Sequence, residues 1–275
     1  MSSETRDQCD TRRHYAGAAS HESYETALRS LKGDLAVEHA SCVEGESNLT
    51  TDGLRRFDGI FFPGSPIQLH EESEETRLAI QFMDRVFEAG TPSFGSCAGL
   101  QIAAVAAGGR SAPRSHGLEA AFSRHVLPTD AGRNHPMLKG RPPVWTAPAM
   151  HSSVVTELPK GAVLLAHNAD TRVEAAEIRH RNGVFWGVQY HPEINLAEIA
   201  ASLRRQSSDL LEQGLAVDEA AVEAHARKLE ALDQDPDRQD LAWQLGLERE
   251  VTDAGRRKLE LKNFLDFLAE RRRTS

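Results

Sequence analysis

Apolar and polar residues alternate along the first hundred residues with two different periods. Apolar side chains that recur every three or four residues predict helices, and short apolar or alternating runs bounded by glycine and proline predict strands. The predicted helices span residues 21–31, 74–90 and 98–107. The predicted strands lie within residues 35–42, 57–66 and 92–96. Strands that alternate with helices at this spacing predict an α/β fold with a mostly parallel, open sheet and helices on both faces.

The middle of the chain, between about residues 120 and 190, is rich in strand-like segments that prolines interrupt. A helical segment over residues 196–214 follows, and from Val217 to the C-terminus the apolar period is again helical. We therefore predict a main domain over residues 1–205 and a helical extension over residues 206–275. We expect the extension to pack on the sheet or on another subunit.

Charge and composition exclude several classes of protein. The 275-residue chain has a formal net charge of −9, and its basic residues are dispersed, so we expect no nucleic-acid partner. No apolar run approaches the roughly 18 to 20 residues of a membrane span, and the N-terminal residues lack the apolar stretch of a secretory signal. Three cysteines without metal-like pairing predict neither a disulfide framework nor a metal or organic cofactor. A cytoplasmic protein is the expectation.

Cys97 lies between two glycines where a predicted strand meets a predicted helix, in the sequence GSCAG. A sharp turn of this kind strains its central residue, and Gly95 and Gly99 remove side chains that would collide there. The N–H groups at the start of the helix favour a thiolate, and the N–H of Ala98 is placed to stabilise an oxyanion. The pattern fits a reactive nucleophile, and it fits a small buried thiol equally well.

A base for such a thiol is present in the sequence GVQYHPE, which follows an apolar strand. His191 and Glu193 project to the same side of an extended chain, and Pro192 keeps the segment out of helical geometry. Glu193 would hold the imidazole in one tautomer and stabilise its charged form, as the third member of a triad. An isolated His-x-Glu pair is usually a surface pair, but this pair follows a strand at the edge where α/β sheets bind ligands.

Three motifs occur in order along the chain: FPGSP, GSCAGLQ and GVQYHPE. Together they resemble the triad-type (class I) glutamine amidotransferases, most closely the glutaminase domain of GMP synthase, over roughly residues 57–203. The resemblance implies a flavodoxin-like fold in which Cys97 attacks the side-chain amide of glutamine. His191 would act as base and acid, and Glu193 would orient His191. The intermediate would be a γ-glutamyl thioester, and the products would be glutamate and ammonia.

The resemblance also implies an oxyanion hole and a residue that contacts the substrate. Gly64 and Ser65 would form the oxyanion loop together with Ala98, and Gln101 would help to hold the substrate glutamine. Ser65 stands where the family often has a second glycine. Its backbone N–H survives this change, so the hole is expected to be intact but less free to change conformation.

A further segment, MHSSVV, resembles a part of the family that contacts the substrate. It would contribute His151 and Ser152 to substrate binding. Ser153 departs from the family, in which an acidic residue often sits near this position.

In the family, ammonia passes to a synthetase that activates an acceptor with ATP. The chain contains neither a Gly-x-x-x-x-Gly-Lys-Ser/Thr loop nor a Ser/Gly-rich pyrophosphate loop after residue 205. We therefore expect either a glutaminase whose acceptor is handled by a synthetase subunit in trans, or a stand-alone hydrolase; a homodimer is compatible with both. The alternatives are a γ-glutamyl hydrolase that cleaves γ-glutamyl amines or peptides with the same triad, and a non-catalytic regulatory subunit.

The N-terminal residues depart from the family pattern. Family members usually begin with an apolar strand at the centre of the sheet, and no segment before His21 has the pattern of one. We expect either a sequence truncated at its start or a sheet that lacks this strand. The second case would leave an apolar gap and make the protein poorly soluble or dependent on a partner.

Overall fold

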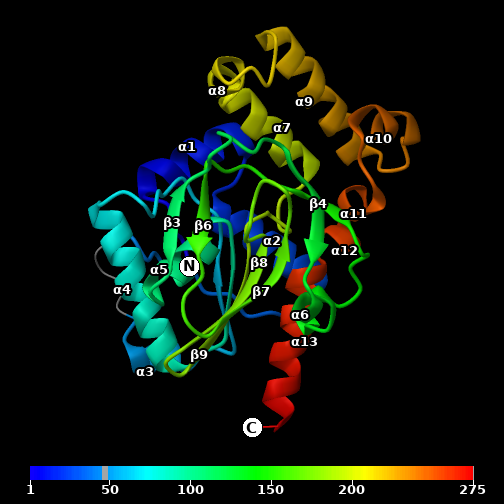
Figure 1. Cartoon of the computed structure of the whole chain (residues 1–275). Coiled ribbons are helices and arrows are strands. Elements are labelled where there is room, and N and C mark those ends of the chain that lie inside the picture. The colour runs from blue at the N-terminus through cyan, green and yellow to red at the C-terminus, as the bar shows by residue number, and fades with distance from the viewer. Residues whose placement is uncertain (45–48, 275) are drawn as a thin grey trace.

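The computed structural model describes residues 1–44 and 49–274. A sheet runs through the middle of the molecule with helices on both sides, and a further group of helices sits above one end of it (Figure 1). The strands are β1 (Ile60–Phe62), β2 (Ser93–Ser96), β3 (Arg110–Pro113), β4 (Phe122–Pro128), β5 (Trp145–Pro148), β6 (Ser153–Glu157), β7 (Ala162–His167), β8 (Ala175–His180) and β9 (Gly183–Val188). The helices are α1 (Arg6–Ala16), α2 (Ser20–Leu31), α3 (Thr51–Leu54), α4 (Glu74–Ala89), α5 (Ala98–Ala106), α6 (Asp130–Arg133), the 3-10 helix η1 (Pro136–Leu138), α7 (Leu196–Arg205), α8 (Ser207–Glu212), α9 (Glu219–Gln234), α10 (Gln239–Leu245), α11 (Arg249–Thr252), α12 (Ala254–Arg257) and α13 (Leu259–Thr274).

Local sequence explains why α4 begins and ends where it does. The Ser73 side chain accepts a hydrogen bond from the Thr76 N–H, and the Thr76 hydroxyl oxygen accepts one from the Ser73 N–H. At the other end, Gly90 takes a left-handed conformation with φ of 76°, which glycine adopts without strain. Both ends of this helix agree with the sequence prediction.

The α/β class and the helices on both faces are confirmed, but the sheet is mixed. Seven strands form it in the order β1-β2-β9-β8-β7-β4-β5. β1, β2 and β9 pair in parallel, whereas every other neighbouring pair in this order is antiparallel. β3 and β6 form a separate antiparallel pair. The expected mostly parallel sheet is therefore correct only for β1, β2 and β9.

Short connections are the physical reason for the antiparallel part. A parallel pair needs a crossover of a dozen or more residues, usually a helix, whereas antiparallel strands can be joined by a tight turn. Only Arg181 and Asn182 separate β8 from β9, and Arg181 takes a positive φ of 49° in that turn. A chain without helix-length segments between β7 and β9 can pair these strands only as hairpins.

The first strand along the described part of the chain is β1. The strand expected within residues 35–42 is not formed, because this segment makes one bridge, between Ser41 and Ser2. The Met1 amino group donates a hydrogen bond to the Phe61 carbonyl oxygen at 2.6 Å. Residues 1–3 thus lie between the segment around Ser41 and β1.

Two apolar cores lie on the two faces of the sheet. Neighbouring residues on β9 point to opposite faces, so Phe185 belongs to one core and Trp186 to the other. The Phe185 core is closed by α4 and α5, and the Trp186 core by α2, η1 and α13. A third core joins α7, α9 and α10 above the sheet (Figure 1).

The last helix, α13, packs against one face of the sheet. Phe264 of α13 is fully buried, and its ring centroid lies 5.4 Å from that of Trp186. The buried Arg141 guanidinium donates hydrogen bonds to Glu260 of α13 at 2.7 and 2.6 Å and to Glu250 at 2.8 Å. These contacts hold the C-terminal residues against the sheet domain. The predicted boundary between two domains at residue 205 stays a prediction.

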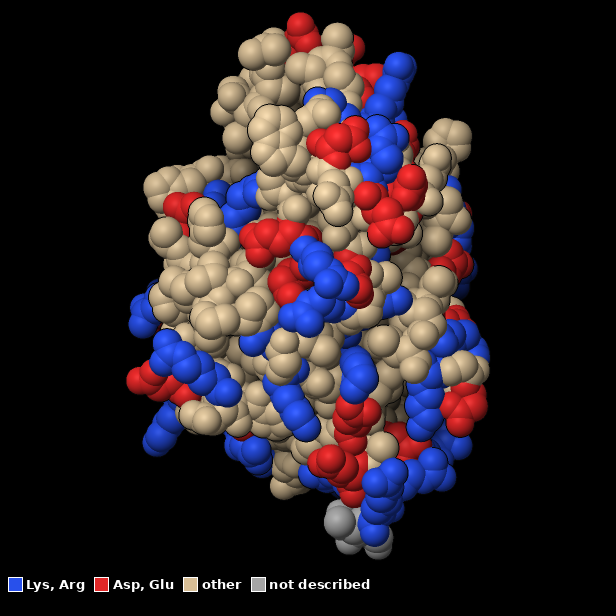
Figure 2. All heavy atoms as spheres, turned by 90° about the vertical axis from the view of Figure 1, so that its right-hand side faces the viewer, with Lys and Arg blue, Asp and Glu red and all other residues tan. Residues whose placement is uncertain are grey.

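The face that carries α10 to α13 is covered by charges of both signs, interspersed rather than gathered in one patch (Figure 2). Among the helices of residues 1–44 and 49–274, none combines the length and the apolar character that crossing a membrane requires.

Candidate active site

Cys97 sits on a strained turn between β2 and α5. Its φ is 51° and its ψ is −108°, a backbone conformation that costs energy for any residue with a side chain. A Cβ on Gly95 would lie 2.7 Å from Phe185 Cζ, and one on Gly99 would lie 2.4 Å from the Phe62 carbonyl oxygen. The two glycines are therefore required by close packing, as the sequence predicts, and the turn presents Cys97 at the end of the parallel strands.

His191 is brought to this turn by the segment after β9. Its N–H donates to the Pro148 carbonyl oxygen at 2.7 Å, and its side chain is almost buried. Nδ1 of the ring lies 2.7 Å from Glu193 Oε1, and the ring is within hydrogen-bonding reach of the Cys97 side chain. A Cβ on Gly64 would lie 2.3 Å from His191 Cε1, so only glycine leaves room for the ring in this position.

The surroundings of His191 favour its charged form. Burial by itself lowers the pKa of His191, but the charge of Glu193 and the hydrogen bonds to Cys97 and Glu193 outweigh it. The pKa of His191 rises from 6.5 to about 10. At neutral pH the ring therefore holds a proton beside Cys97.

A chain of hydroxyl groups fixes the other side of Glu193. The Ser96 hydroxyl donates to Glu193 Oε2 at 2.9 Å, and the Tyr24 hydroxyl lies 3.0 Å from the Ser96 oxygen. Tyr24 is buried, and burial raises the pKa of its phenol well above the usual value. Tyr24 lies within the helix that the apolar period predicts over residues 21–31, and no sequence motif assigns a role to Ser96. Ser96 immediately precedes Cys97, and this adjacency is the signal that could have found it.

Three backbone positions that the sequence assigns to an oxyanion hole lie around Cys97. Ala98 is the first residue of α5, so its N–H has no acceptor within the helix. Gly64 and Ser65 lie in the loop after β1 and line the same cavity as Cys97. The Ser65 hydroxyl accepts a hydrogen bond from Ser3 at 2.8 Å, which anchors this loop to the N-terminal segment.

Gln101 lines the cavity, but its amide is already engaged. Its Nε2 donates to the Ser153 carbonyl oxygen at 2.9 Å and lies 3.3 Å from Gln189 Oε1, and its Oε1 accepts from Ser111 at 2.9 Å. In this arrangement Gln101 braces β3 and β6 against α5. Any contact with a substrate would have to replace one of these bonds.

His151 and Ser152 also line the cavity, on the segment before β6. His151 is buried, with Nε2 at 3.0 Å from Glu119 Oε2, while Ser152 is exposed. Burial lowers the pKa of His151, and the negative charge of Glu119 opposes this effect. Burial thus favours the neutral form of His151, which can hydrogen-bond a substrate without adding charge.

The cavity at Cys97 has a volume of about 510 Å³. One of its walls is α1 and the residues before it, which contribute Glu4, Asp7 and Arg12. This segment has no part in the site that the sequence predicts, because its polar composition is that of a surface helix. The cavity lies within the range of small-molecule binding sites.

Residues 17–207 match the family model "Glutamine amidotransferase class-I", and the chain belongs to this family. It is accordingly an enzyme of the amide hydrolase and amidotransferase class that uses a cysteine nucleophile.

Two curated relatives show how far the similarity extends. A gamma-glutamyl-L-1-hydroxyisopropylamide hydrolase from Pseudomonas sp. is 36% identical over 203 residues, 73% of this chain and 68% of that protein. A glutamine-hydrolysing GMP synthase from Leifsonia xyli subsp. xyli is 32% identical over 144 residues, 52% of this chain. That match spans only 27% of the synthase.

A glutamine amidotransferase structure from Thermotoga maritima has the same fold, with a TM-score of 0.62. The superposition covers 90% of this chain and 91% of that one, at 15% sequence identity. The similarity includes most of the C-terminal helices, so the fold is shared beyond the parallel strands.

Proposed function

We propose that this enzyme hydrolyses γ-glutamyl amides, with Cys97 as the nucleophile, His191 as the proton carrier and Glu193 as the residue that positions His191. The observation that carries the proposal is the placement of these three side chains at a cavity of about 510 Å³. A substrate amide in this cavity meets the thiol, the ring and the N–H of Ala98 together, which is the geometry that acyl transfer needs.

The reaction proceeds through a thioester. Cys97 Sγ attacks the γ-carbonyl carbon, and the carbonyl oxygen takes negative charge next to the N–H of Ala98. The C–N bond then breaks, and His191 gives its proton to the leaving amine. Water attacks the thioester, His191 accepts the proton of the water, and the C–S bond breaks to release glutamate. The proton returns to the sulfur or stays on His191, and the enzyme is restored.

The volume of the cavity leaves room for a substituted amide as well as for glutamine. Glutamine releases ammonia, which needs little space, whereas a γ-glutamyl alkylamide needs room beside the amide nitrogen. The lining of the cavity includes Cys97, Tyr15 of α1 and Arg205. The hydrolase from Pseudomonas sp. matches this chain over 73% of its length, more than the GMP synthase does, and it is named for an amide of this kind.

The cavity also offers cations for the α-carboxylate of a γ-glutamyl group. Arg12 lines it, is largely buried, and has an Nε with no hydrogen-bond partner. Arg205 lies 5.0 Å from the centre of the Tyr15 ring on the same wall. A guanidinium binds a carboxylate through paired N–H donors, so either residue suits an amino-acid substrate.

The second candidate is a glutaminase that feeds ammonia to a synthetase subunit in trans. The observation in its favour is the similarity to the glutaminase part of GMP synthases, which carry the remaining three quarters of their length beyond the match. The same triad would act, and the acceptor would bind on the partner.

Glutamate release from two substrates distinguishes the candidates. The full-length protein is incubated with glutamine or with γ-glutamyl isopropylamide, and kcat/KM is compared. We expect the alkylamide to be preferred, Cys97→Ala to abolish release, and the matched buried-thiol variant Cys42→Ala to retain it. Hydroxylamine added to the reaction should trap the acyl group as γ-glutamyl hydroxamate.

A preference for glutamine would favour the second candidate. Equal activity of the Cys97→Ala variant would contradict both candidates, because neither can proceed without the nucleophile.

A further inference from the structure

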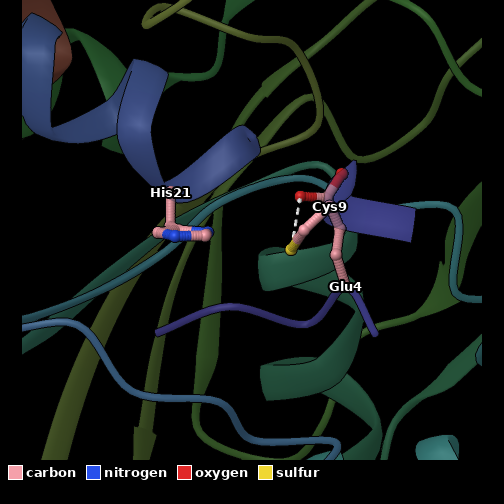
Figure 3. Close-up of side chains that lie close together, drawn as sticks. All are labelled: Glu4, Cys9 and His21. Carbon is pink, nitrogen blue, oxygen red and sulfur yellow. Dashed lines mark hydrogen bonds between the residues drawn. The ribbon is translucent and has the colours of Figure 1, made fainter. Parts of the chain in front are cut away.

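Three side chains of the kinds that bind zinc meet at the base of α1. Glu4 precedes α1, Cys9 lies in α1, and His21 lies in the first turn of α2. Their ligand atoms all lie within 4.8 Å of one another. Figure 3 shows the three side chains converging on one space, with an edge of the His21 ring facing the Cys9 sulfur. We propose that Glu4, Cys9 and His21 bind a zinc ion that fastens α1 to α2.

The distances are close to those of a zinc site. Zinc binds sulfur at about 2.3 Å and carboxylate oxygen at about 2.0 to 2.2 Å, so tetrahedral geometry separates two such ligands by about 3.6 Å. Cys9 Sγ and Glu4 Oε2 are 3.8 Å apart. The remaining pairs lie within 4.8 Å and need to close by no more than about 1.4 Å, a movement that rotation of side chains can supply.

The carboxylate of Glu4 is buried, and a cation would stabilise its negative charge. Glu4 is 4% exposed, and within residues 1–44 and 49–274 no lysine, arginine or histidine nitrogen lies within ion-pairing distance of its carboxylate. Its Oε2 accepts a hydrogen bond from the Ser20 N–H at 2.9 Å and a weak one from the Cys9 thiol. Buried carboxylates are normally paired with a cation or bound to a metal, and zinc would supply the positive charge.

His21 is available as a ligand. Its Nδ1 is buried and has no hydrogen-bond partner among the described residues. Burial lowers the pKa of His21, and the neighbouring His39 ring, whose centroid lies 4.8 Å away, lowers it further. A neutral imidazole is the form that binds metals.

The combination of one sulfur, one nitrogen and one oxygen ligand selects the metal. Calcium and magnesium prefer sites made of oxygen alone, whereas zinc accepts thiolate, imidazole and carboxylate together. Three protein ligands leave the fourth tetrahedral position to water. Burial raises the pKa of the Cys9 thiol, and zinc would release its proton, because a thiol that coordinates zinc binds as the thiolate.

A zinc ion at this site would affect the wall of the active-site cavity, although none of its ligands belongs to the triad. Glu4 lines the cavity, and so do Asp7 and Arg12 of the same helix. Zinc bound to Glu4 and Cys9 would hold this wall in place against α2. The inference concerns metal binding and does not depend on which amide the enzyme cleaves.

Cobalt(II) is a suitable probe, because a thiolate ligand gives it a charge-transfer absorption band. The full-length chain is made with Cys97→Ser, which removes the active-site thiol as a competing ligand, and is stripped of metal with a chelator. We expect one equivalent of cobalt to produce the band and zinc to displace it. Added Cys9→Ser or His21→Ala should abolish the band, and added Cys42→Ser, which removes another buried thiol, should keep it.

Thermal unfolding gives a second readout. Zinc should raise the melting temperature of the Cys97→Ser protein and leave that of the His21→Ala variant unchanged. Absence of the band, its persistence without Cys9, or its loss with Cys42→Ser would each overturn the proposal. If the Cys9→Ser chain does not fold by circular dichroism, the His21→Ala variant decides the question.

Discussion

Replacing Glu193 by glutamine removes the charge beside His191 while keeping the shape of the side chain. In the wild-type protein this charge is the largest contribution that raises the pKa of His191 to about 10, against the effect of burial. An opposite charge in contact shifts a pKa by roughly 1 to 3 units, so the pKa of His191 should fall by about that amount in Glu193→Gln. This corresponds to roughly 1.4 to 4 kcal/mol of proton linkage.

The sign of the effect on stability follows from the raised pKa. Folded His191 binds its proton more tightly than unfolded His191, so this stabilisation is complete below pH 6.5 and is lost as the pH rises to about 10. In Glu193→Gln it is smaller and is lost at a lower pH. The gap in unfolding free energy between wild type and variant should therefore be roughly 1.4 to 4 kcal/mol larger at pH 6.5 than near pH 10.

Urea unfolding across this pH range measures the gap. Ser96→Ala is the matched control, because it removes the hydrogen bond to Glu193 Oε2 but leaves the charge, and it should follow the wild-type pH dependence. In the amide-hydrolysis assay, Glu193→Gln should lower kcat/KM by about 10² to 10⁴-fold. Identical pH dependence in wild type and Glu193→Gln would refute the assigned cause of the His191 pKa.

Three further changes test the packing around the site and the C-terminal residues. Gly64→Ala would place a Cβ 2.3 Å from His191 Cε1, so we expect a loss of about 10²-fold or more in kcat with an unchanged circular dichroism spectrum; normal kcat would contradict the assigned contact. Phe264→Ala should lower the unfolding free energy by about 3 to 5 kcal/mol in urea, because it empties a fully buried site. Arg141→Met should cost about 3 to 5 kcal/mol in the same assay, since it leaves the buried Glu260 without its cation; a change below 1 kcal/mol would mean that the ion pair does not hold α13.

The sequence predicts the local parts of this protein well. The strand, turn and helix around Cys97 are predicted from the glycines at 95 and 99, although the closest atoms that a Cβ would meet there belong to the distant residues Phe185 and Phe62. The end of α4 is read in the same way, from Gly90. The family is identifiable for a similar reason, since three short motifs in a fixed order need no knowledge of distant contacts.

The direction of the later strands in the mixed sheet is a feature that the local apolar pattern does not predict. The prediction of a mostly parallel sheet extends the alternation of helices and strands before Gly109 to the whole chain, although the segments between β5 and β9 are too short to contain crossover helices. Connection length carried the information about strand direction, and the apolar pattern did not.

Only the tertiary structure determines which residues hold the side chains of the site in position. Tyr24 reaches Ser96 across 72 positions of sequence, and α1 forms a wall of the cavity at Cys97 although its composition is that of a solvent-exposed helix. The Gln101 amide is satisfied by β3 and β6, and Phe264 packs on the sheet from the end of the chain. Short motifs thus contain the side chains that we propose to react. The positions of these side chains depend on contacts between distant segments, and those contacts form only when the sheet has assembled and buried the segments.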